Sequence, residues 1–288
     1  MLWLFFALGS AFFAGITAIL AKVGIRSVPS NLATALRTGV VLVFAWGMVF
    51  LVGSQRELAS LSGQALGFLL LSGLATGGSW LCYFRALQLG DVNKVTPIDK
   101  SSTVLTILLA CLFLGEPLSL PQVLGMVGIG GGTLLMITRK DTGGAAAPSR
   151  WRWLAYALGS AVFASLTALF GKMGVAEIES NLATAVRTVV VLAMAWVMVF
   201  LTGEQKALGQ VDRRSAVFLV LSGLATGGSW LCYFRALQDG PASVVVPVDK
   251  LSILVTVLFS CLVLKEPLGK KAALGLVLIL AGTGAMLL

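Results

Sequence analysis

The stretch LSGLATGGSWLCYFRALQ at residues 71–88 recurs letter for letter at residues 221–238. The same spacing brings NLATA at 31–35 back at 181–185, and it aligns the rest of the chain without a gap. Self-similarity at a fixed period is the signature of a repeated architecture. The sequence therefore predicts one module written twice.

We place the first module at residues 1–138 and the second at residues 153–288, with about half of the aligned positions identical. The linker, residues 139–152, is basic, rich in small residues and interrupted by Pro148. Such a composition is typical of a flexible surface loop.

The composition excludes several classes of protein. The chain has 288 residues, of which 58% are hydrophobic and only 11% charged, and a mean hydropathy of +0.96. A soluble domain averages about 25% charged residues. A chain with less than half that share cannot cover a water-facing surface, so most of its outer surface must face lipid. A soluble enzyme, a nucleic-acid-binding module and a disulfide scaffold are thereby excluded. The net charge of +9 comes from basic residues in short gaps between apolar runs, where the positive-inside rule explains them and no nucleic-acid partner is needed.

Catalytic and metal chemistry have few candidate residues. The chain has no His, so a Ser-His-Asp triad and His metal ligands are excluded. The cysteines form no CxxC pair and lie in apolar stretches, as expected of packing residues; they are Cys82, Cys111, Cys232 and Cys261. We expect no metal and no cofactor.

Each module contains five apolar runs of the roughly 17–25 residues that cross a bilayer. They lie near 2–21, 31–52, 66–88, 95–114 and 121–138, and again near 153–171, 181–202, 216–238, 245–264 and 271–288. The predicted fold is all-α and integral to the membrane, with ten transmembrane helices. The first run lacks a preceding basic residue and a cleavage site, so we expect no removable signal peptide.

The charge bias predicts that the modules insert in opposite directions. Five helices carry a module from one side of the membrane to the other. Basic residues of the first module gather on the side of its C-terminus, and those of the second on the side of its N-terminus. By the positive-inside rule the linker lies in the cytoplasm and both termini lie outside, in a cytoplasmic (inner) membrane.

Inverted repeats are typical of secondary transporters, which bind substrate near the midplane where the repeats meet. Channels such as aquaporins also use inverted repeats, so the pattern favours transport without specifying alternating access.

Four motifs, each present in both modules, carry a family resemblance. NLATAxRT opens the second helix, GLATGGSWLCYFRAL lies in the third, PxDK opens the fourth, and LxEPL closes it at residues 114–118 and 264–268. In these motifs the chain resembles the EamA family of the drug/metabolite transporter superfamily. The resemblance implies a ten-helix exporter or exchanger of small metabolites, with a cavity lined by the first four helices of each module. The fifth helices are then expected mainly to pack the scaffold. The two halves are more alike than the resemblance leads one to expect, as if two single-module relatives were fused.

Ionisable side chains at bilayer depth are functional candidates by default. Arg37 lies well inside the second helix. The fourth helix is uncharged only from Ser101 to Leu114, too short to span, so Asp99 and Lys100 must dip into the membrane. Because Pro97 has no N–H to donate, it favours a broken or late-starting helix there.

Position along the helices groups these side chains into two clusters, one at each mouth of the cavity. They are Arg37, Arg85, Asp99, Lys100 and Glu266 on the cytoplasmic side, and Arg187, Arg235, Asp249, Lys250 and Glu116 on the outer side. One interpretation makes them gates whose ion pairs alternate and whose spare positive charge receives an anionic or zwitterionic group. The other makes them ion pairs that only lock helices together. Asp99 and Asp249 are also candidate carriers of a coupling proton.

Trp80, Tyr83, Trp230 and Tyr233 lie three residues apart on the third helix of each module, and so on roughly one face. They could line a substrate pocket or stack on a cation; interfacial anchoring is the alternative. The glycines at 73 and 77, and those crowding 125–132, predict close helix packing.

The sequence thus predicts a transporter of a small polar or amphipathic metabolite, in which a single chain suffices. A flippase for a lipid or lipid-linked headgroup, an integral-membrane enzyme and a non-transporting membrane protein stay open as alternatives.

Overall fold

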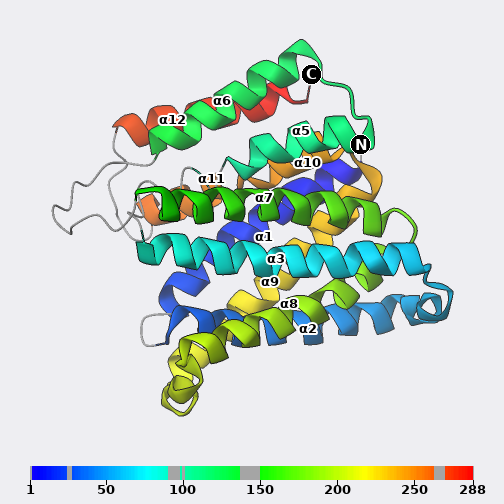
Figure 1. The fold of residues 1–288 in the computed structure, drawn as a ribbon, viewed down its shortest axis with the longest axis vertical. Helices are drawn as coiled ribbons and strands as arrows, with labels where there is room; N and C mark the ends of the chain where they lie inside the picture. Colours follow the sequence, from blue (N-terminus) through cyan, green and yellow to red (C-terminus); the bar gives the residue numbers. More distant parts are fainter. Residues whose placement is uncertain are drawn as a thin grey trace. The chain divides into compact units, whose positions relative to one another are not determined.

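The computed structural model describes residues 2–24, 28–89, 98, 101–136, 150–262 and 270–287. Within these ranges the chain is helical with short connections, and no strand is found there. The elements are α1 (Leu2–Gly24), α2 (Ser30–Val52), the 3₁₀ helix η1 (Ser54–Ser60), α3 (Gly63–Leu89), α5 (Ser102–Leu114), α6 (Leu120–Met136), α7 (Arg150–Val175), α8 (Ser180–Thr202), the 3₁₀ helix η2 (Glu204–Gln210), α9 (Arg213–Asp239), α10 (Ala242–Asp249), α11 (Ser252–Leu262) and α12 (Lys270–Ala285) (Figure 1).

The predicted all-α class is confirmed. Five helices within the described ranges are long and apolar enough to cross a membrane, namely Ser30–Val52, Gly63–Tyr83, Arg152–Val175, Ser180–Thr202 and Arg213–Asp239. Shorter apolar helices cover Leu2–Thr17, Ser102–Leu114, Leu120–Leu135 and Ala273–Ala285. Large apolar side chains lie on the outside, with Leu51 81% exposed and Leu112 75% exposed. Lipid is the solvent that such a surface requires.

Two compact units make up the structure. Unit 1 comprises Met1–Gly77, Phe170–Gly240 and Val248–Glu266; unit 2 comprises Gly78–Leu169, Pro241–Pro247 and Pro267–Leu288. Each unit thus contains segments from both sequence repeats.

In unit 1, α1 packs along α9 and α11, and the α1–α9 contact is antiparallel. Gly240, just after α9, lies against the start of α1, since a Cβ there would be 2.7 Å from the Trp3 ring. Thr226, in the middle of α9, lies farther along α1, where its hydroxyl is 3.3 Å from that of Thr17. Small residues on α9 therefore allow α1 to approach closely.

The second contact in unit 1 joins α2 to α8, which occupy equivalent positions in the two repeats (Figure 1). Buried Ala45 and Val49 of α2 pack against Leu182 and Ala185 of α8. Residue 49 lies near the end of α2 and residue 182 near the start of α8, so the two helices run antiparallel. Each ends at a glycine with positive φ, Gly53 and Gly203, which is the usual stop signal of a helix.

In unit 2, α6 and α12 lie side by side through glycine (Figure 1). A Cβ at Gly132 would lie 2.5 Å from the Gly275 carbonyl oxygen, and one at Gly125 would lie 2.5 Å from that of Gly282. The predicted glycine packing is confirmed at these positions, but Gly131 faces open space.

This contact gives a matched pair of variants. Gly132→Val forces two helix backbones apart, and we expect it to destabilise the protein by about 2 kcal/mol, the usual cost of overpacking. Gly131→Val adds the same side chain where nothing lies within 4 Å and should leave stability unchanged. Thermal unfolding of the purified variants in detergent measures the difference. Equal Tm values would mean that α6 and α12 do not pack through Gly132.

Candidate functional site

Arg187 is a charged side chain enclosed within unit 1, only 3% exposed. It projects from α8 toward α3, where its Nε donates to Ser72 Oγ at 2.9 Å and its Nη2 donates to Thr76 Oγ1 at 2.6 Å. Two rings of α9 lie beside the guanidinium, with centroids 5.0 Å away for Trp230 and 4.9 Å for Phe234. Its Nη1 is buried and has no hydrogen-bond partner.

Asp249 lies at the end of α10, in the same unit as Arg187. Ser10 of α1 donates to the Asp249 carboxylate at 2.6 Å, and Ser10 in turn lies 3.2 Å from the Ser229 hydroxyl. Tyr233 of α9 lies within electrostatic range of both Arg187 and Asp249. The predicted residues Arg187, Tyr233 and Asp249 are therefore brought together, with Ser10 as a member that the sequence reasoning did not name.

The helix that carries Asp249 is broken. After α10 the Leu251 N–H donates to the Val248 carbonyl at 3.0 Å, three residues back, and α11 starts afresh at Ser252. Lys250 lies in the break, where its Nζ is 3.8 Å from the Asp249 carboxylate and its side chain is 41% exposed. The sequence predicted such a break from Pro97 in the first repeat.

The first repeat has a turn at the equivalent place. The Ser101 N–H donates to the Ile98 carbonyl at 3.2 Å, and α5 begins at Ser102. Asp99 and Lys100, the residues predicted to form the matching charge pair, lie outside the described residues, as does Glu266.

Arg37, the repeat equivalent of Arg187, has different surroundings. Its side chain is only half-buried, and in the described structure its guanidinium has no hydrogen-bond partner. The hydroxyls equivalent to Ser72 and Thr76 are those of Ser222 and Thr226, and both contact Thr17 of α1. Two arginines in nearly identical sequence contexts thus occupy different environments.

The other predicted residues that the structure describes have surroundings of their own. Arg235 pairs with Asp239 of its own helix at 3.2 Å, with both side chains 38% exposed. In unit 2, Arg85 is exposed and Trp80 is half-buried on α3. Tyr83, also half-buried, packs against the Ala86–Ala157 cluster, which fits a structural role.

Glu116, predicted as a gate residue, lies at the N-terminus of α10 in unit 2. Its Oε1 accepts from the Ala242 N–H at 2.7 Å and its Oε2 accepts from the Ser243 N–H at 2.8 Å. A carboxylate at this end satisfies orphan donors and complements the helix dipole. Glu116 therefore holds the start of the short helix that ends at Asp249.

Lys172 holds the end of α9 in unit 1. Its Nζ donates to the carbonyls of Leu237 and Gly240, the latter at 2.7 Å, where the helix leaves acceptors unpaired. Gln238 adds a reverse link by donating to the carbonyls of Val175 and Ile178. The sequence signal was the recurrence of this lysine as Lys22 near the end of an apolar run.

Lys172→Met should release the end of α9. The variant leaves two carbonyls without their charged donor, and we expect a loss of about 2 kcal/mol in the free energy of unfolding. Lys206→Met, at an exposed position of η2, is the control and should change stability by less than about 0.5 kcal/mol. Chemical unfolding in detergent compares them, and a stable Lys172→Met protein would contradict this role.

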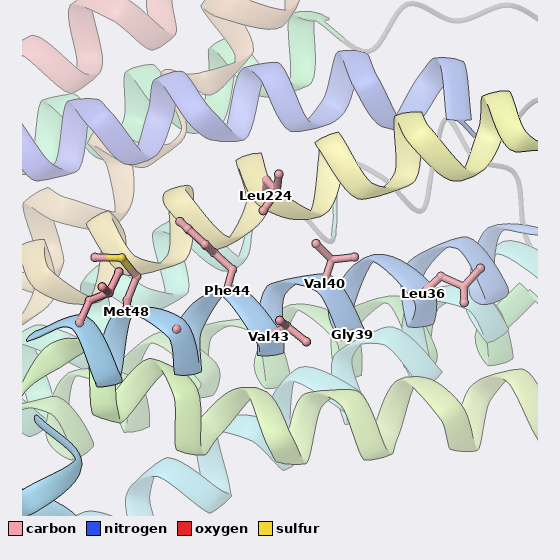
Figure 2. A pocket seen from close by; sticks show the side chains of 9 residues that line it. Leu36, Gly39, Val40, Val43, Phe44, Met48 and Leu224 are labelled. Atoms are coloured by element: carbon pink, nitrogen blue, oxygen red, sulfur yellow. The ribbon is translucent and has the colours of Figure 1, made fainter. Parts of the chain in front are cut away.

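A groove on the lipid-facing side of α2 has a volume of about 570 Å³. It is lined by the α2 face that runs from Leu36 through Val43 and Met48 to Leu51, and by Leu224 of α9 (Figure 2). Every lining side chain is apolar, and the two glycines, Gly39 and Gly47, leave room in it. Since sites for polar ligands contain convergent polar groups, this groove suits an acyl chain and not a polar metabolite.

Comparison with known proteins places the chain among transporters. The pattern of the EamA-like transporter family matches residues 1–138 and 151–288. A protein of a Sinorhizobium species named "Uncharacterized transporter in cobO 3'region" is 49% identical over 134 residues, which are 46% of this chain and 95% of that protein. A solved structure titled only "Crystal structure of protein" has a TM-score of 0.74 at 18% identity, covering 96% of this chain and 94% of the other. That last likeness concerns the fold alone.

Proposed function

We propose that this chain, which belongs to the EamA-like transporter family, is a secondary transporter that exports or exchanges a small polar or amphipathic metabolite by alternating access. The family match and the named relative identify an integral membrane transporter and not an enzyme. In this proposal ten transmembrane helices form two inverted repeats in the cytoplasmic membrane. The linker is cytoplasmic, the termini lie outside, and one chain is the transport unit.

The direction of equivalent helices supports the inversion. Asn31 at the start of α2 hydrogen-bonds Glu204, just beyond the end of α8, and the Glu179 N–H, just before α8, donates to Glu57 beyond the end of α2. Helices that occupy the same place in the two repeats therefore run in opposite directions. Inverted-topology repeats require this arrangement.

The unequal surroundings of Arg37 and Arg187 carry the proposal. The serine and threonine pairs on α3 and α9 lie in segments of identical sequence, 71–88 and 221–238. Arg187 hydrogen-bonds its pair, whereas Arg37 does not hydrogen-bond its own. Because the segments that carry the two arginines and their hydroxyl pairs are nearly identical, the proposal assigns the difference to conformation. In the opposite state the two arginines exchange environments, and exchange between inverted repeats is how alternating access operates.

The broken helix supplies the second part of the mechanism. Freed backbone and a charge pair at a helix break are features of transporter sites. In the proposal Asp249 and Lys250 gate one mouth, and Asp99 and Lys100 gate the other. Asp249, whose carboxylate accepts a hydrogen bond from Ser10, is the candidate carrier of a coupling proton.

Thiol labelling tests the exchange. Arg37→Cys and Arg187→Cys are made, singly and together, in a chain whose four native cysteines are serine. Right-side-out and inside-out vesicles are treated with a membrane-impermeant charged thiol reagent. We expect position 37 to react only from the linker side and position 187 only from the other side. In the double variant, reaction at either position should slow reaction at its mate.

Other outcomes overturn the proposal. Labelling of both positions from both sides, with independent rates, indicates a channel. Complete protection of position 187 from both sides indicates a protein that does not exchange conformations.

The apolar groove favours a second candidate, a flippase for a lipid or lipid-linked headgroup. An acyl chain would occupy the groove on α2 while the headgroup crosses the protein. Dithionite quenching of fluorescent phosphatidylcholine in proteoliposomes tests it. Quenching of about half the label in protein-free controls and of more with the protein would support the flippase; equal quenching would exclude it for this lipid.

A further inference from the structure

The Arg187 guanidinium is enclosed with donors to spare. Arginine carries five N–H donors. Among the described residues, Arg187 uses two of them, the N–H of Nε for Ser72 and one N–H of Nη2 for Thr76. One N–H of Nη2 and both N–H groups of Nη1 remain, and Nη1 is buried without a partner. A buried donor without a partner is costly, so the site is incomplete in this state.

No carboxylate near Arg187 balances its charge within the described helices. The Arg187 guanidinium contacts residues of α3 and α9, and Arg187 itself belongs to α8. The only acidic residue in these three helices is Asp239, which is paired with Arg235. Asp249, at the end of α10, accepts from Ser10 and faces Lys250. The rings of Trp230 and Phe234 offset part of the cost through cation–π contact, but a buried cation calls for an anion.

We propose that the Nη end of Arg187 binds the carboxylate of the transported molecule, a monocarboxylate with an apolar or aromatic body. This inference rests on the proposed transport function and names its substrate class.

The geometry of the site selects among anions. The two Nη nitrogens of a guanidinium form a planar fork that matches a carboxylate. A phosphate dianion would need a second cation, and Lys250, the cation at the helix break, already faces Asp249. The Trp230 and Phe234 rings flank the guanidinium and give an apolar body something to pack against.

Benzoate and benzamide are the test probes because they differ only in charge and in one atom of the head. Thermal unfolding of the full-length protein in detergent is followed while each is titrated. Benzoate should raise Tm and benzamide should not. Arg187→Gln should weaken benzoate binding by about 10- to 100-fold, the range expected for loss of a charged hydrogen-bonding partner.

Arg56→Gln is the control, since Arg56 is an exposed arginine of η1 outside the proposed site; benzoate should still raise its Tm. Arg187→Lys keeps the charge without the planar fork, so it tests the site if the glutamine variant does not fold, and its benzoate affinity should fall. The inference is overturned if benzoate does not raise the Tm of the wild type. It is also overturned if benzoate raises the Tm of both Arg187 variants as much as that of the wild type.

The labelling experiment separates this inference from the transport proposal. Side-specific, anticorrelated labelling without benzoate binding leaves transport standing and rejects the carboxylate. If benzoate binding depends on Arg187 but positions 37 and 187 are both labelled from both sides, the carboxylate site stands and alternating access is rejected.

Discussion

Glu116→Ala is expected to lower the free energy of unfolding by about 2 kcal/mol and to reduce transport by more than that loss explains. The variant removes both acceptors from the N–H groups of Ala242 and Ser243. Because α10 is only eight residues long, it has few hydrogen bonds of its own to hold its first turn. A displaced α10 also displaces Asp249 at its other end, which couples a structural cap to the site.

Two variants separate the cap from simple loss of charge. Glu116→Gln keeps the size but offers one acceptor oxygen where two N–H groups point, so it should be nearly as unstable as Glu116→Ala. Glu177→Ala removes an exposed carboxylate that accepts from Ser62 and should cost less than about 0.5 kcal/mol. Chemical unfolding in detergent measures all three. A Glu116→Ala protein with wild-type stability would show that the cap is dispensable.

The sequence alone located the helices well where apolar length and glycine determine them. The predicted runs 31–52 and 181–202 agree with α2 and α8 to within a residue, since Gly53 and Gly203 end both helices with positive φ. The break predicted from Pro97 has its counterpart in the second repeat after Asp249. Pro247 itself lies inside α10, so the proline marks the region and not the break point.

The contacts between distant helix ends could not be predicted. Glu116 and Ala242 are 126 residues apart, and Asn31 and Glu204 are 173 apart. Hydrophobic periodicity reports which face of a helix is apolar, but not which loop meets its end. The structure shows Glu116 as the cap of α10. Its role as a gate residue stays a prediction.

The two arginines mark a further limit. Arg37 and Arg187 follow the same NLATA segment, so the sequence predicted equal roles for them. Equal sequences in inverted repeats allow two conformations, and one structure records only one assignment. Which arginine is enclosed is therefore information that no repeat pattern contains.

Glu204→Ala should destabilise the protein by about 3 kcal/mol, and a second substitution should restore it. Glu204 caps α2 from the other repeat: its carboxylate accepts from the N–H groups of Asn31 and Leu32, each at 3.0 Å, and from the Asn31 side chain at 2.6 Å. The residue before α2, Pro29, provides no side-chain cap. Thus α2 depends on a residue 173 positions away.

The second repeat solves the same problem locally. Glu179, the repeat equivalent of Pro29, caps its own helix α8 by accepting from the N–H groups of Asn181 and Leu182. The backbone at the two positions is nearly the same, with φ and ψ of −54° and 144° at Pro29 and −59° and 134° at Glu179.

Pro29→Glu can therefore place a local cap on α2, and the double variant Pro29→Glu, Glu204→Ala should regain most of the stability lost by Glu204→Ala alone. Thermal unfolding in detergent of the wild type, both single variants and the double variant forms a double-mutant cycle. In the single variant Pro29→Glu the new carboxylate competes with Glu204 for the same donors, so its gain should be small. A double variant no more stable than Glu204→Ala would mean that Glu204 acts through its place in η2 and not through the N–H groups of α2. Rescue would show that the two repeats stabilise equivalent helices by interchangeable caps, one within a repeat and one between repeats.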